Sequence, residues 1–284
     1  FYAFKILCYN SFITDIGRLV MRAEQMKLRK IFEEQMSRDY CCSMDDIHST
    51  ENIYCKRELR NGRRRFKKDD AILKVLCING KCIFSGREEI LSKCKDTFQD
   101  LNGAWMSQYK YLYWLDDLLL EHKYFLEDLH HYYLPLGHEL LDEETLEAMQ
   151  KEYEIRWYER EDIEQFRGDE RFVHAYSFLE HAPDVLGIAA VKDGMILGMA
   201  GASADSDVMW QIGIDVMPES KGLNIGPFIT ILLKREILKR GKLPYYGTVE
   251  SHIQSQKVAV KSGFVPYWAE INSAPLPEDV NDAV

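Results

Sequence analysis

Residues 214–227 combine two glycines and a lysine in a pattern that could bind an anion. They read IDVMPESKGLNIGP, between a predicted strand and a predicted helix. Gly222 and Gly226 permit close approach of the backbone, and Pro227 suits the first position of a helix, where no N–H is needed. The first N–H groups of that helix, its dipole and the charge of Lys221 would then hold a diphosphate. The alternative is an ordinary strand–loop–helix connection whose glycines only serve the turns.

Two carboxylates end the strands predicted beside this loop. Asp215 lies near the end of the strand expected at 208–216, and Glu250 ends the strand expected at 244–250. Sites on open α/β sheets form at the carboxyl ends of strands. We therefore predict that Glu250 is a general base, acting directly or through a water. Asp215 is the second candidate, although a solvated or ion-paired role is favoured for it.

The elements that position these residues follow from apolar periodicity and turn signals. In the second half, further strands are expected at 153–158, 185–192, 195–202 and 264–271, and helices at 162–180, 227–240 and 252–262. In the first half, we expect a helix at 26–36, a hairpin at 72–84 around Asn79-Gly80, and a helix at 105–133.

Pro135 and Gly137 end that last predicted helix, so we place a domain boundary near 136–150. The prediction is an amino-terminal α+β domain of unknown role at 21–140, a second domain at 150–272 and a flexible tail at 273–284. Residues 1–20 are assigned no function.

Two segments of the second half resemble the signatures of the GNAT-type N-acetyltransferases. The family's acetyl-CoA pyrophosphate loop has the pattern Arg/Gln-x-x-Gly-x-Gly/Ala, and Lys221-Gly222-Leu223-Asn224-Ile225-Gly226 is similar to it. Lys replaces Arg or Gln, and Asn224 replaces the first motif Gly; Asn is the residue besides Gly that best tolerates left-handed backbone. Residues 251–264 resemble the second signature, a helix that opens with Asn and ends in Gly-Phe. The resemblance covers about 150–272 and implies a mixed, mostly antiparallel sheet flanked by helices.

The resemblance implies acyl transfer from acetyl-CoA to a primary amine of a small molecule or peptide, by direct attack in a ternary complex. Backbone groups near Ile214 and Val216 would bind the pantetheine arm, and the loop from Lys221 to Gly226 would bind the diphosphate. His252 stands at the Asn position of the second signature, and it and Ser255 would contact the pantetheine.

The sequence also departs from the family's catalytic pattern. Ala259 stands where the family often has a tyrosine general acid, and Trp210 stands where an acidic residue is frequent. Tyr245, Tyr246 and Tyr267 are the candidates to replace that tyrosine. The alternative function is therefore a non-catalytic sensor that binds acyl-CoA.

Composition limits the other functions. The formal net charge of −10 argues against a protein that coats nucleic acid. The basic stretch 56–68 could be a nucleic-acid arm, but a solvated hairpin or loop is favoured. Glu127 and His130 have the spacing of a metal-ligand pair on a helix, but a second such pair is lacking, so no metal ligand is assigned.

The cysteines and the apolar segments indicate where the protein resides. All seven cysteines lie within the first 94 residues, and their odd number predicts reduced thiols in the cytoplasm. No apolar run reaches the length of a membrane span. The oligomeric state is not predicted.

Overall fold

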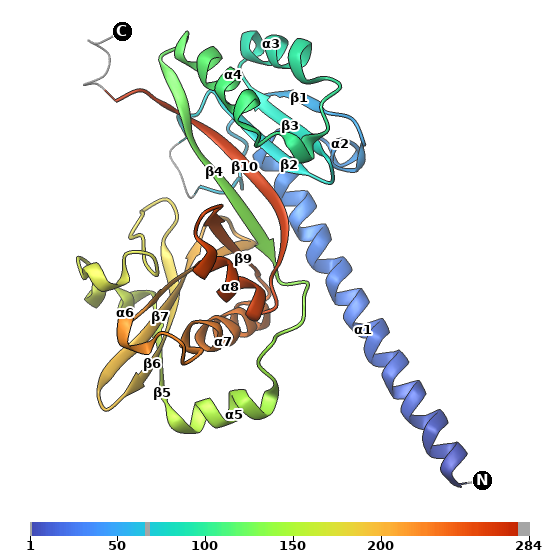
Figure 1. Cartoon of the computed structure of the whole chain (residues 1–284), viewed down its shortest axis with the longest axis vertical. Coiled ribbons are helices and arrows are strands. Elements are labelled where there is room, and N and C mark those ends of the chain that lie inside the picture. Colours follow the sequence, from blue (N-terminus) through green and yellow to red (C-terminus); the bar gives the residue numbers. More distant parts are fainter. Residues whose placement is uncertain (1, 66–68, 278–284) are drawn as a thin grey trace.

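A computed structural model describes residues 2–65 and 69–277, with side chains described from residue 21 onward. The amino-terminal part contains α1 (Tyr2–Asp39), α2 (Met44–His48), β1 (Ile53–Lys56), β2 (Leu73–Ile78), β3 (Lys81–Gly86), α3 (Glu88–Phe98), the 3₁₀ turn η1 (Gly103–Trp105), α4 (Tyr109–Leu120) and β4 (Tyr124–Leu134). In Figure 1, α1 projects from the rest of the molecule.

The second part contains α5 (Glu143–Glu152), β5 (Glu154–Glu159), α6 (Arg160–Ile163), η2 (Glu164–Phe166), η3 (Glu170–Phe172), β6 (Asp184–Lys192) and β7 (Met195–Ala204). It continues through β8 (Met209–Val216), η4 (Pro218–Ser220), α7 (Ile225–Lys239), β9 (Leu243–Val249), α8 (Ile253–Lys261) and β10 (Val265–Pro275). Among the described residues, no helix combines the length and the apolarity needed to cross a bilayer.

One ten-stranded sheet runs through the described chain in the order β1-β3-β2-β10-β4-β9-β8-β7-β6-β5. The β1–β3 and β8–β9 pairs are parallel and the other neighbours are antiparallel. The fold is therefore the mixed, mostly antiparallel α/β arrangement that the sequence predicted.

Strands β4 and β10 join the two parts of the chain. The two long strands run side by side (Figure 1), and β10 also pairs with β2, while β4 also pairs with β9. The division near 136–150 remains a prediction, but backbone hydrogen bonds of one sheet connect the residues on its two sides. Because β10 extends to Pro275, the first residues of the predicted tail belong to a strand; residues 278–284 of that tail lie outside the described residues.

The predicted helix at 105–133 is wrong in its second half. Helix α4 ends at Leu120, and after a turn with Lys123 at φ 60° the chain enters β4, which contains both Glu127 and His130. Strand β10 pairs with β4 along its length, and β9 pairs with the other edge at residues 130–133. Long-range pairing has therefore overridden the local helical spacing, and the metal-ligand spacing of Glu127 and His130, which assumed a helix, does not apply.

The predicted helix at 162–180 is also wrong. Only the short α6, η2 and η3 are helical there, and Gly168 with φ 82° interrupts them. The predicted helix at 26–36 is correct but is only part of α1. The hairpin predicted at 72–84 is confirmed, with left-handed Asn79-Gly80 at its turn. The strands predicted at 185–192 and 195–202 form a second hairpin, β6–β7, around left-handed Asp193-Gly194.

The described part of the basic stretch, 56–65, is largely the exposed loop that was favoured, but some of its arginines are held by the protein. The Arg60 guanidinium donates to the carbonyls of Ser37, Cys41 and Cys42, and Arg64 is buried. These arginines attach the stretch to the end of α1. Residues 66–68 lie outside the described residues.

A stripe of three glycines lets the chain after η3 cross the sheet. Gly187, Gly201 and Gly213 face one another on β6, β7 and β8. A Cβ on Gly213 would lie 1.9 Å from the His174 carbonyl oxygen, and one on Gly201 would lie 2.0 Å from that of Ala175. The backbone of 174–176 therefore lies directly on the sheet, on the face opposite α7.

We expect Gly213→Ala to lower the free energy of unfolding by about 1–3 kcal/mol, because the added methyl overpacks against backbone that cannot simply rotate away. Urea unfolding measures the change, and limited proteolysis should show faster cleavage near Tyr176. An unchanged unfolding midpoint together with an unchanged cleavage pattern would contradict the close packing.

Candidate functional site

The loop between β8 and α7 adopts the left-handed backbone that its sequence favours. Gly222 has φ 88° and Asn224 has φ 57°, and α7 begins at the next residue, Ile225. Asn224 is thus a non-glycine residue in the left-handed region, as expected from its place in the motif. The Lys261 ammonium donates to its side-chain Oδ1 at 2.9 Å, which ties the end of α8 to the start of α7.

Four backbone N–H groups of this loop have no acceptor among the described residues. They belong to Gly222, Asn224, Ile225 and Gly226, whereas the Leu223 N–H donates to the Ser220 carbonyl at 3.3 Å. A helix start leaves such donors unsatisfied and carries a partial positive charge. With the exposed Lys221 beside them, the loop has the donors and the charge to hold a diphosphate.

Strands β8 and β9 separate next to this loop. Their parallel pairing ends at Ile212 and Tyr246, although β8 continues to Val216 and β9 to Val249. Residues 213–216 keep their partners on β7, so their edge toward β9 has no ladder in the described sheet. The opening leaves backbone donors and acceptors free for an extended, amide-containing ligand.

The end of β8 and the helices α7 and α8 pack against one another at Gly226. A Cβ at Gly226 would lie 3.2 Å from methyl groups of Val216 and Val258 and 3.5 Å from Ile214. The structure therefore places Ile214 and Val216 against the loop; that these residues bind a ligand stays a prediction. Ile225, the first residue of α7, is buried in the core, while Leu223 is exposed.

A side-chain hydrogen bond between β9 and α8 lies close to the opening. The hydroxyls of Tyr246 and Ser255 are 2.9 Å apart, and Tyr246 lies at the last paired position of β9. Burial raises the pKa of Tyr246 to about 12, so this phenol is protonated at neutral pH. His252 is the exposed N-cap residue of α8. The pair could not be found from sequence, because Tyr246 and Ser255 belong to different elements.

The other two tyrosine candidates lie elsewhere. The Tyr245 hydroxyl is buried against Asp205 and Gln211, and Tyr267 packs edge-on against Phe32 of α1 with ring centroids 5.0 Å apart. Ala259 is fully buried and Trp210 is almost so. Of the three, Tyr246 is the one hydrogen-bonded to α8.

The two predicted catalytic carboxylates have different surroundings. Glu250 is exposed in the turn after β9, where its backbone carbonyl accepts from the Gln256 side chain at 2.6 Å. The Asp215 carboxylate accepts from the backbone N–H groups of His174 and Ala175, both at 2.9 Å. Asp215 therefore holds the segment that crosses the sheet. Because side chains alternate along a strand, its carboxylate lies on the opposite face of β8 from the side chains of Ile214 and Val216.

Comparison with known proteins gives matches among solved structures. No protein-family model matches the sequence, and no curated protein does. The similar structures include a GCN5-related N-acetyltransferase-like protein from Streptococcus suis, with 17% identity over 69% of this chain and 82% of that one and a TM-score of 0.42. A GCN5-related N-acetyltransferase from Kribbella flavida has 13% identity over 60% and 66% of the two chains and a TM-score of 0.40.

A third similar structure is an aminoglycoside N-acetyltransferase in complex with CoA. It has 22% identity over 40% of this chain and 92% of that one, with a TM-score of 0.31. Many of the similar structures are thus GNAT-family acetyltransferases. Because these TM-scores are below 0.5, we base the function proposed below on the loop and strands of this chain.

Proposed function

We propose that the protein binds an acyl-CoA, acetyl-CoA being the expected one, and transfers its acyl group to a primary amine. The observation that carries the proposal is the opening between β8 and β9, directly beside four N–H groups that find no acceptor in the described part of the chain. A diphosphate joined to an extended, amide-containing arm matches that arrangement: the diphosphate would bind at Lys221–Gly226, and the arm would add its amides to the free edge of β8.

The reaction proposed is direct attack in a ternary complex. The neutral amine attacks the thioester carbonyl, a C–N bond forms, the C–S bond breaks, and the sulfur leaves as a thiolate that takes up a proton. Glu250 is the proposed base for the amine proton. The Tyr246 hydroxyl, hydrogen-bonded to Ser255, is the proposed proton donor to the sulfur. Holding both reactants in place supplies much of the rate.

A panel of amines with acetyl-CoA, monitored by release of free thiol, tests the proposal. We expect CoA to bind and at least one amine to be acetylated. Binding of CoA without turnover on any amine would favour the alternative, a non-catalytic acyl-CoA sensor, which the buried Ala259 at the usual tyrosine position supports. Absence of CoA binding would overturn both functions.

Glu250→Gln is expected to lower kcat by roughly 100-fold, the lower end of what a general base contributes. The affinity for CoA should not change, because Glu250 lies in the turn after β9, outside the diphosphate loop. Glu147→Gln on the exposed face of α5 is the matched control. An unchanged kcat in Glu250→Gln would remove Glu250 from the proposed mechanism.

The acceptor and the compartment are further parts of the proposal. The acidic balance of the chain would attract a cationic amine, of a small molecule or a peptide. The predicted location is the cytoplasm, where acyl-CoA and reduced thiols occur together.

A further inference from the structure

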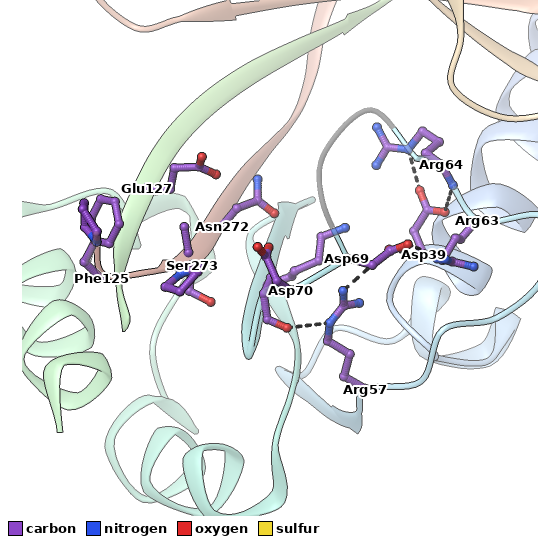
Figure 2. Close-up of a pocket in the computed structure, with 15 residues that line it drawn as sticks. Asp39, Arg57, Arg63, Arg64, Asp69, Asp70, Phe125, Glu127, Asn272 and Ser273 are labelled. Carbon is purple, nitrogen blue, oxygen red and sulfur yellow. Dashed lines mark hydrogen bonds and ion pairs between the residues drawn. The ribbon is translucent and has the colours of Figure 1, made fainter. Parts of the chain in front are cut away.

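A cavity of about 380 Å³ lies in the amino-terminal part, between the ends of β2, β4 and β10 and the arginines that follow β1. Figure 2 shows Arg57, Arg63 and Arg64 at one end of it and Phe125 at the other. The volume is at the lower end of the range for small-molecule sites. Its lining includes none of the residues assigned to the acyl-CoA loop, so it is a separate site.

Three of the four cations that line this cavity are held by groups of the protein. Arg64 forms ion pairs with Asp39 and Glu270, and Arg63 forms one with Asp69. Arg57 donates to the Ala71 carbonyl at 2.9 Å and lies 4.0 Å from Asp69. These contacts fix the arginine end of the cavity before any ligand arrives.

Lys74 is the fourth cation and has no ion-pair partner among residues 21–65 and 69–277. Its ammonium lies 4.9 Å from the centre of the Tyr40 ring. The side chain is largely enclosed, and burial lowers its pKa from the ordinary value. The nearby carboxylates of Glu270 and Asp39 offset part of this effect, but both already pair with Arg64. An enclosed ammonium without an ion-pair partner of its own is costly, and an anion in the cavity would lower that cost.

A polar row that includes Lys74 crosses the sheet, and two of its members, Lys74 and Asn272, line the cavity. Lys74 faces Ser85 on β3 and Asn272 on β10, and Asn272 in turn faces Asp128 on β4. The buried Ser85 hydroxyl has no hydrogen-bond partner in the described part of the chain. The Asn272 amide donates to Asp128 at 3.2 Å. Such a row is unusual inside a sheet, where apolar side chains would pack better, and it is consistent with a site for a polar group.

The opposite end of the cavity carries its apolar side chains, Phe125, Ala274 and Pro275. The Glu127 carboxylate lies beside Phe125 (Figure 2), so the acid group of a ligand is expected at the other end. We propose that the cavity binds a small organic monocarboxylate, with its acid group at Lys74 and Arg57 and its apolar body against Phe125. A charged head and an apolar body match the two ends, and a charge-assisted hydrogen bond to Lys74 would supply the anchor.

Titration calorimetry of the full chain with benzoate, hexanoate and inorganic phosphate tests this assignment. We expect saturable binding of at least one of the two carboxylates and weaker binding of phosphate, which has no apolar body. Lys74→Met should reduce carboxylate affinity at least 10-fold, and the matched control Lys93→Met, on α3 outside the cavity, should not. CoA affinity, measured on the same variants, should be unchanged, which separates this site from the proposed acyl-CoA site.

Phe125→Ala is the second variant, in case Lys74→Met disturbs the fold. It should weaken hexanoate more than acetate, because only hexanoate reaches the apolar end. The proposal is overturned if neither benzoate nor hexanoate binds, if phosphate binds more tightly than both, or if Lys74→Met and Phe125→Ala leave carboxylate affinity unchanged.

Discussion

Lys221→Glu is expected to weaken CoA binding by about 10- to 100-fold while leaving the fold intact. The side chain is exposed at the start of the loop, so its replacement disturbs no packing. The change replaces an attractive charge by a repulsive one next to four N–H groups that would hold the diphosphate. Calorimetry with CoA measures the loss, and it should shrink as salt is added, because exposed charges are screened.

The ligand pantetheine makes this test specific. Pantetheine lacks the diphosphate, so its affinity should be the same for the wild-type chain and for Lys221→Glu. Lys27→Glu, the same charge change on the exposed side of α1, is the matched control and should bind CoA normally. Equal CoA affinity in Lys221→Glu and wild type would remove the diphosphate from this loop. Gly226 is a poorer position for such a test, because its packing against Val216 and Val258 would confound binding with stability.

Arg64→Met is expected to destabilise the protein by about 3–5 kcal/mol, the usual cost of leaving buried charges without their partner. Arg64 is buried between Asp39 at the end of α1 and Glu270 on β10. Its backbone N–H also donates to Asp39 at 2.9 Å, and Trp268 donates to Glu270 at 2.7 Å. Methionine would fill the volume but leave two buried carboxylates facing each other.

Urea unfolding with a check of the m-value measures this loss. Arg156→Met is the control, because Arg156 pairs with Glu154 at the exposed edge strand β5, and its midpoint should not move. A double variant in which Asp39→Asn accompanies Arg64→Met should recover part of the stability. If the urea midpoint of Arg64→Met equals that of the wild-type chain, the buried ion pairs do not hold α1 to the sheet.

The backbone of the candidate diphosphate loop could be predicted from sequence because the loop is one short segment. Lys221, Gly222, Asn224 and Gly226 lie within residues 221–226, and the left-handed φ of Gly222 and Asn224 follows from their residue types. The Asn-Gly and Asp-Gly hairpins were predictable for the same reason.

Local pattern failed where distant strands decided the structure. Residues 124–134 carry helical spacing, yet they form β4 because β10 pairs along the strand and β9 pairs with residues 130–133. The segment 174–176 was expected to be helical, yet it crosses the sheet because three glycines on three different strands leave room for its backbone. Neither fact is visible in a window of neighbouring residues.

The sequence by itself determined the turns, the loop that could hold a diphosphate and most of the second-half strands, because these depend on backbone preferences and on apolar periodicity over a few residues. Only the tertiary structure decided that β8 and β9 separate beyond Ile212 and Tyr246, that Tyr246 meets Ser255, and that Asp215 fastens a crossing segment. It also placed Arg64 between two buried carboxylates and left Lys74 in a cavity without an ion pair among the described residues. These features depend on contacts between residues far apart in the chain, and such contacts follow from how the whole sheet packs.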